Sequence, residues 1–402
     1  MATVLSLPWQ KSVRPSPKEL WEPRYAMVDA WRGLAALGVV FYHLGFELRS
    51  DFDLGHVCVM VFFVISGYCI AASTESCKRN KVSPQSYMWR RVRRIYPPYF
   101  FAICFFAATR VVKMRMGMGQ QLSTSLVAWI QNFTMTQWFS LVFHPAAHPF
   151  DNSALFVAGF WSLNYEEQFY LVMGLLMFGA IRFGRNMLPG VIALMFLGFV
   201  WNLTHKLVSH GFFWEYWVAF GLGALVFYRL CKIRERNGRA AIDLAIVVFL
   251  VFALWRYHSS TTFGSRWLYT EWIATAFFAL VLICLRSRDT RFKNSRLGVA
   301  LGAFGLISYS LYLTHQCNLR ASSMVASKLI RWGLPQFFEF PIRVVFCCAV
   351  GAAFWYFCER PFLNKPLPNR SAAKLEVAAL KPKSNRSIAE LSAGDMRAGQ
   401  AR

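Results

Sequence analysis

The chain has 402 residues, of which 56% are hydrophobic and 17% aromatic, and it carries 44 Lys and Arg against 20 Asp and Glu. Its many apolar runs of about twenty residues exclude an ordinary soluble domain and indicate a protein that crosses a membrane several times. The formal charge of +24 does not indicate nucleic-acid binding, because the basic residues lie in short segments between apolar runs, as orientation in a membrane requires.

The N-terminal stretch has no sustained apolar core followed by a cleavage site of small residues, which argues against a removable signal peptide. We therefore expect residues 1–25 to be a cytoplasmic segment. The first apolar run, 27–46, then acts as its own insertion signal.

That first run contains Asp29, Arg32 and His43. Arg32 and His43 are eleven residues apart, close to three helical turns, so they share one face and are separated by about 16 Å along the axis. Asp29 lies within reach of Arg32 for an ion pair, which alone can be structural. A histidine deep in a span with an arginine on the same face has few structural uses, so His43 is a functional candidate.

Ten apolar runs are predicted to cross the membrane, near 27–46, 54–73, 95–113, 160–181, 188–203, 212–230, 240–257, 267–286, 298–319 and 338–358. If these ten runs cross and the N-terminus is cytoplasmic, four basic segments lie on the cytoplasmic side and hold 19 Lys and Arg. The loops on the other side of the membrane hold eight. The predicted fold is therefore an all-α integral membrane protein with about ten transmembrane helices and both termini cytoplasmic.

A weaker apolar run at 122–143 would reverse this charge bias if it crossed, so we predict that it does not. Residues 114–159 then form a long extracytoplasmic segment between the third and fourth helices. Such a segment can cover a site.

Basic residues follow the second run in "MWRRVRRIYPPY", which contains Arg90, Arg91, Arg93 and Arg94. Alone, this cluster is typical of a cytoplasmic anchor. Guanidinium groups also bind phosphates through several donors in one plane, so an anion site at the inner level is a second interpretation.

Two further groups are predicted to reach the outer level together with His43. Glu166 and Glu167 lie in the first turns of a helix that runs inward, and His315 ends a run that goes outward. Glu166 can instead cap its helix, and His315 can be an interior histidine with ordinary hydrogen bonds. We expect His43, His315 and one of the glutamates to meet in one cavity.

The ten cysteines form no CxxC pair, so we expect neither a disulfide framework nor a metal site. The predicted membrane domain covers residues 26–362. Residues 363–402 are rich in Lys, Arg, Ala and Ser and predict a disordered basic cytoplasmic tail.

Five motifs in this order resemble the membrane-bound acyltransferase 3 family: "VDAWRGLAALGVVFYH", "VFFVISGY", "RRVRRIYPPY", "WSLNYEEQFY" and "SYSLYLTH". The resemblance covers about residues 25–362. It implies a multi-pass enzyme of the bacterial inner membrane, embedded among lipids, that transfers an acyl group from acetyl-CoA or another acyl-CoA to a carbohydrate or a lipid-linked glycan, without a metal.

The resemblance also implies roles for individual residues. The catalytic set becomes His43, Glu166, Glu167 and His315, with His43 as the base that a glutamate orients. The donor-binding set becomes Arg32, Arg90, Arg93, Arg94, Ser66 and Gly67. Tyr309, Ser310 and Tyr312 are candidates to stabilise an oxyanion.

A transporter or flippase is the alternative from a different class, in which the intramembrane Arg, His and Glu form a proton or substrate path. The motifs also leave open whether the acyl group is acetyl, succinyl or longer, which glutamate acts, and from which side the acceptor enters.

Overall fold

The computed structural model describes residues 25–46, 53–117, 125–139, 156–205 and 211–363, and these contain helices but no β-strand. The predicted all-α class is confirmed for these residues. The predicted N-terminal segment 1–25 and the basic tail 363–402 lie outside them, apart from one residue of each.

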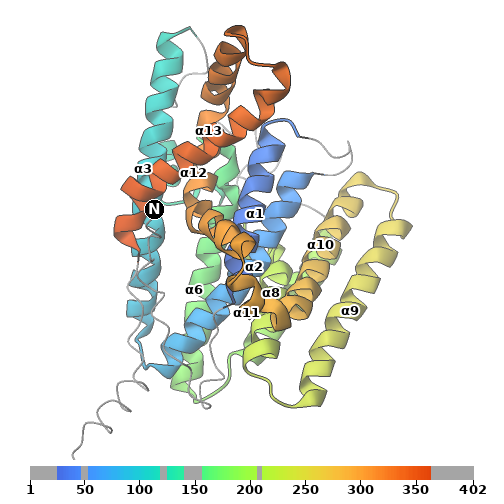
Figure 1. Ribbon diagram of the computed structural model, residues 1–402. Helices are drawn as coiled ribbons and strands as arrows, with labels where there is room; N and C mark the ends of the chain where they lie inside the picture. Colours follow the sequence, from blue (N-terminus) through green and yellow to red (C-terminus); the bar gives the residue numbers. More distant parts are fainter. Residues whose placement is uncertain (1–24, 47–52, 118–124, 140–155, 206–210, 364–402) are drawn as a thin grey trace, which may run out of the picture.

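Each of the ten predicted apolar runs corresponds to one helix in the described part of the chain (Figure 1). These helices are α1 (Ala26–His43), α2 (Leu54–Arg79), α3 (Pro84–Arg115), α6 (Trp161–Arg182), α7 (Leu188–His205), α8 (Trp217–Cys231), α9 (Arg236–Ser259), α10 (Phe263–Leu285), α12 (Arg296–Arg331) and α13 (Glu339–Phe354).

Six helical segments in the described ranges are long and apolar enough to cross a membrane, and they correspond to α2, α3, α9, α10, α12 and α13. Helices α7 and α8 contribute two shorter apolar segments. These features are those of a multi-pass membrane protein. The count of ten crossings and the side on which the termini lie stay predictions.

The weak apolar run contains only the short helix α4 (Leu126–Phe133), which has eight residues. At 1.5 Å per residue such a helix is about 12 Å long, too short to cross a membrane. Leu126 and Val127 are exposed. The rest of the run that follows residue 139 lies outside the described residues.

The basic turns between helices gather at one end of the bundle. Lys78, at the end of α2, donates a 2.6 Å hydrogen bond to the carbonyl oxygen of Arg185 in the α6–α7 turn. Lys232 in the α8–α9 turn forms an ion pair with Glu75 of α2. Asp289, in the short helix α11 (Asp289–Lys293), accepts hydrogen bonds from the first N–H groups of α1. We call this end of the bundle the Arg32 end and the opposite one the His43 end.

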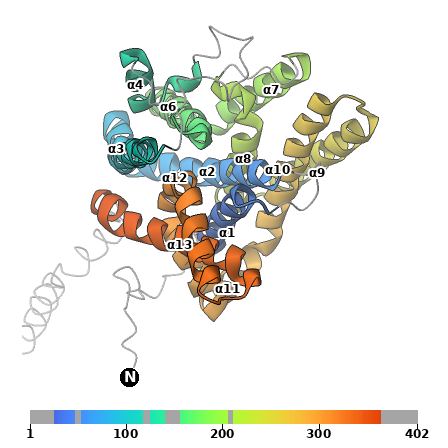
Figure 2. The same cartoon turned by 90° about the horizontal axis from the view of Figure 1, so that it is seen from above.

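Helix α1 lies near the middle of the bundle, between α2 and α12, as Figure 2 shows from above. It packs closely on α12, because a Cβ atom on Gly33 would lie 2.8 Å from the backbone nitrogen of Gly305. A Cβ atom on Gly305 would in turn overlap the carbonyl oxygen of Asp29. This glycine contact lets the backbones approach, and ten residues further along both helices His43 faces His315.

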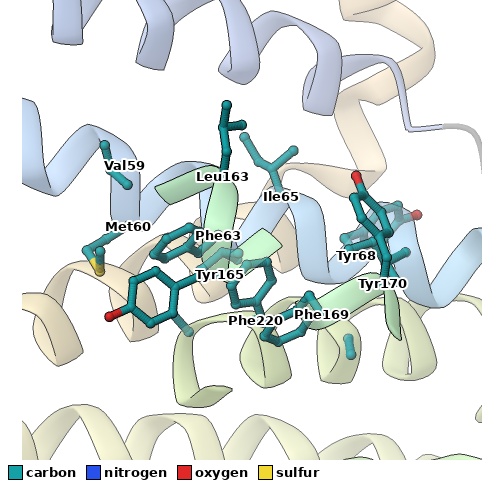
Figure 3. Close-up of a cluster of buried hydrophobic side chains, with 14 of the residues drawn as sticks. Val59, Met60, Phe63, Ile65, Tyr68, Leu163, Tyr165, Phe169, Tyr170 and Phe220 are labelled. Carbon is teal, nitrogen blue, oxygen red and sulfur yellow. The ribbon is translucent and has the colours of Figure 1, made fainter. Parts of the chain in front are cut away.

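Helices α2, α6 and α8 share an aromatic core, in which Phe63 stacks on Phe220 with 4.6 Å between ring centroids (Figure 3). Two glycines allow this close packing. A Cβ atom on Gly67 would overlap the carbonyl oxygen of Phe220, and one on Gly223 would overlap that of Val64. Gly67, which the resemblance places in the donor site, therefore has a clear packing role between α2 and α8.

Replacing Gly223 by alanine should destabilise the protein by about 1–3 kcal/mol, because the added methyl group forces α2 and α8 apart. The control is Gly302→Ala in α12, where a Cβ atom has nothing within 4 Å. Thermal unfolding of the detergent-solubilised variants measures the difference. Equal unfolding temperatures for Gly223→Ala and Gly302→Ala would contradict the close α2–α8 contact.

Candidate functional site

Two histidines from α1 and α12 face each other at the His43 end of the bundle. The ring centroids of His43 and His315 lie 5.0 Å apart. Nδ1 of His315 is 2.7 Å from the carbonyl oxygen of Tyr312 and therefore carries the proton that it donates. Its Nε2 is buried and has no hydrogen-bond partner among the described residues. His315 thus holds a free lone pair inside the protein.

The hydrogen-bond partner of His43 is Gln316. The Gln316 side-chain oxygen accepts a 3.2 Å hydrogen bond from the N–H of Gly159, which turns its amide nitrogen toward His43 Nε2 at 3.2 Å. An amide nitrogen only donates, so His43 Nε2 is an acceptor and its own proton lies on Nδ1. Sequence analysis missed Gln316, although it directly follows His315 in "LTHQ".

Gly159 also fixes Tyr312, the residue one turn before His315. The hydroxyl of Tyr312 donates to the carbonyl oxygen of Gly159 and lies 2.6 Å from the hydroxyl of Ser162, which must then donate to it. Since Gly159 lies in the short helix η3 (Ala158–Phe160) directly before α6, these bonds join the start of α6 to α12.

The three hydroxyl groups considered as oxyanion donors are engaged elsewhere. Tyr309 donates to the carbonyl oxygen of Ile95 at 3.1 Å, and Ser310 donates to a Glu359 carboxylate oxygen at 2.6 Å. Tyr312 donates to Gly159 as described. In this structure each of the three hydroxyl protons thus has an acceptor within the protein.

The structure differs from the expectation that Glu166 or Glu167 joins the histidine pair. Glu166 accepts hydrogen bonds from Ser66 at 3.2 Å and from Tyr170 at 2.6 Å. Glu167 accepts one from Tyr96 at 3.1 Å. Both carboxylates thus find hydroxyl donors on α2, α3 and their own helix, while the acceptor nitrogen of His43 is already occupied by Gln316.

Arginines from α1 and α3 lie near Glu166 in the interior of the bundle, close enough to interact electrostatically but without an ion pair between these described residues. The charge of Glu166 acts on both Arg32 and Arg91, and the Arg91 guanidinium lies 4.9 Å from the centre of the Tyr170 ring. The charges of Arg32 and Arg94 both act on Glu359. We call Arg32, Arg91, Arg94, Glu166 and Glu359 the arginine–glutamate cluster.

Glu359 was missed by sequence analysis. It is 2% exposed and lies in a π-helical turn, η7 (Trp355–Glu359), that continues α13. Wide turns of this kind often occur at functional sites. In the sequence, Glu359 stands at the end of an apolar run beside Arg360, where it resembles an ordinary flanking charge.

The other two arginines that the resemblance assigns to donor binding, Arg90 and Arg93, lie outside the arginine–glutamate cluster. Arg93 is exposed and Arg90 is half-buried, whereas Arg91, outside that set, packs against Tyr170 and Tyr87. Residues spaced three or four apart share a helix face, so Arg91 and Arg94 form one side of α3. The three cluster arginines Arg32, Arg91 and Arg94 are half-buried and make no ion pair among the described residues.

These two groups of residues can do different chemistry. The histidine pair offers neutral imidazole nitrogens that can accept a proton. The arginine–glutamate cluster presents guanidinium donors suited to an anion. In the ranges that the structure describes, no group of three or more His, Cys, Asp and Glu side chains is placed to hold a metal ion.

Residues 25–360 match the family model described as "Acyltransferase domain". The chain is similar to the O-acetyltransferase OatA of Staphylococcus aureus, with 30% identity over 162 residues that cover 39% of this chain and 26% of that protein. It is also similar to the peptidoglycan O-acetyltransferase OatA of Listeria monocytogenes, with 29% identity over 181 residues that cover 43% of this chain and 28% of that protein.

The matched segment thus spans about a quarter of the length of these relatives. No solved structure matches the chain. Because the family match covers most of the sequence, the protein belongs to the acyltransferase 3 family.

Proposed function

We propose that this protein is a membrane O-acetyltransferase of the bacterial inner membrane. It moves an acetyl group from acetyl-CoA on the cytoplasmic side to a hydroxyl of a cell-surface or exported carbohydrate. The family and the names of the OatA relatives support this activity. The observation that carries it is the histidine pair with Gln316, because it provides an oriented proton acceptor inside a membrane bundle.

His43 acts as the base in this proposal. A sugar hydroxyl is a weak nucleophile at neutral pH, so its proton must be removed as its oxygen attacks the thioester carbonyl. The hydroxyl takes the place of the Gln316 amide at His43 Nε2, which accepts the proton. The intermediate then collapses, the carbon–sulfur bond breaks, and His43 returns the proton to the departing thiolate. The free Nε2 lone pair of the neighbouring His315 stabilises the positive charge on His43 in between.

The arginine–glutamate cluster binds the donor in this proposal. Its half-buried arginines lie on α1 and α3, toward the Arg32 end of α1, where the basic turns gather. Phosphate groups of acetyl-CoA need several guanidinium donors, and Arg32, Arg91 and Arg94 make no ion pair with a described residue that would compete. The acetyl thioester then extends along α1 toward His43.

His43→Ala should lower acetyl transfer by about a hundredfold or more, the usual contribution of a positioned general base. The assay follows radiolabel from acetyl-CoA into surface glycan in membranes with matched protein levels. His258→Ala is the control, because His258 is an exposed histidine on α9. Equal labelling by His43→Ala and His258→Ala would remove His43 from the chemistry, and no labelling by the wild type would favour the transporter alternative.

Gln316→Ala should lower kcat/KM for the acceptor by about tenfold to a hundredfold, because the Gln316 amide holds the His43 ring in position until the acceptor hydroxyl takes its place. The same labelling assay, run at varied donor and acceptor concentrations, measures this. Asn318→Ala is the matched control, since that buried amide donates to Thr314 of its own helix. A similar loss of kcat/KM in both variants would indicate general damage to α12.

Arg94→Gln should raise the KM for acetyl-CoA by about tenfold, since a charge-assisted hydrogen bond is worth about 1.5–3 kcal/mol. The control Arg236→Gln removes an exposed arginine at the start of α9, at the same end of the bundle. Steady-state kinetics with varied acetyl-CoA measure both. If Arg236→Gln raises the KM equally, the donor is attracted by overall charge and not by the cluster.

A further inference from the structure

A pocket at the His43 end plays no part in the mechanism above. It lies between the start of α2 and the turn from α9 to α10, and its volume is about 100 Å³. Its lining includes Asp53, His56, Tyr257, Arg266, Trp267 and Glu271. The pocket is small, so it suits a single unit of a longer ligand whose remainder stays outside.

The polar groups of this pocket include both donors and acceptors. Glu271 is 6% exposed, and its carboxylate lies 2.5 Å from Nε2 of His56. Arg266 is exposed, and its Nε donates a 2.9 Å hydrogen bond to the carbonyl oxygen of Ser260. A buried carboxylate in a membrane protein is costly and usually has a function, yet nothing in the proposed transfer uses Glu271.

Aromatic rings surround these polar groups. The Trp267 ring centroid lies 4.8 Å from that of His56, and His56 stacks on Trp161 with an angle of 10° between the ring planes. The Arg266 guanidinium lies 5.9 Å from the centre of the Tyr257 ring. The pocket therefore combines flat apolar faces with charged hydrogen-bonding groups.

This combination matches the chemistry of a sugar unit. A pyranose ring has an apolar face of C–H groups that packs on an aromatic ring, and hydroxyls that donate to carboxylates and accept from arginine or histidine. A lipid tail would offer no further hydrogen bonds to the charged groups of Glu271 and Arg266. A phosphate would be repelled by Asp53 and Glu271, which line the same small cavity.

The pocket adjoins the histidine pair. Gly55, in the first turn of α2, lies against Tyr42, because a Cβ atom there would be 2.5 Å from the Tyr42 ring. Tyr42 precedes His43, and their ring centroids are 5.2 Å apart. On the other side, Trp161 stacks on His56 and follows two residues after Gly159, which holds Gln316.

We propose that this pocket binds a sugar unit of the acceptor carbohydrate and places a neighbouring hydroxyl toward His43. Trp267 supplies a stacking face, and Glu271 and Arg266 hydrogen-bond to sugar hydroxyls. This proposal rests on the acetyl transfer proposed above and names the place where its acceptor binds.

The test is steady-state acetyl transfer by the full-length protein in membranes, with labelled acetyl-CoA and with surface glycan isolated from the producing cells as the titrated acceptor. Trp267→Ala should raise the KM for the glycan by about tenfold or more, the loss typical of a buried aromatic contact. It should leave kcat and the KM for acetyl-CoA within about twofold. Trp267→Phe, which keeps an aromatic face, should restore most of the glycan affinity.

Trp255→Ala is the matched control, because Trp255 lies on α9, is 61% exposed and does not line the pocket. The same KM for glycan in Trp267→Ala and Trp255→Ala would overturn the proposal. A fall in kcat at unchanged glycan KM would also overturn it, since that pattern indicates a structural role. An inactive wild type would instead refute the acetyl transfer itself, and the acceptor pocket with it.

Discussion

The close contact of α1 with α12 determines how the two histidines lie relative to each other. Gly33 and Gly305 let the two backbones touch, and the helices then run side by side from this contact to His43 and His315. A shift of one residue on either helix would turn its side chains by about 100°, so the imidazoles would no longer face each other. The histidine pair therefore depends on a contact made by two residues without side chains.

Packing and polar contacts have to hold such a bundle together, because lipid tails are as apolar as the helix surfaces. The glycines on α2 and α8 serve the packing, and the hydroxyl groups of Ser66, Tyr96 and Tyr170 satisfy the two glutamates of α6. The ionisable residues are thus arranged at two levels along α1. One level gathers arginines, and the other holds neutral histidines.

Helix positions and shared faces were predictable, because hydropathy marks the runs and an eleven-residue spacing sets Arg32 and His43 on one face. The meeting of His43 with His315 followed from the alternating direction of the runs. The partners of Glu166 and Glu167 were not predictable, since they depend on how α6 is rotated about its axis. Gln316 and Glu359 were missed because an amide beside a histidine and a charge at the end of a run are common in sequences.

Gly159 makes two separate contacts with α12 through a single residue. Its N–H binds Gln316, and its carbonyl oxygen accepts from Tyr312. A displacement of this short backbone segment would break both bonds together, and the Gln316 amide that faces His43 would lose the bond that orients it. The segment before α6 and the reactive imidazole are therefore mechanically coupled, so that a movement of one changes the freedom of the other.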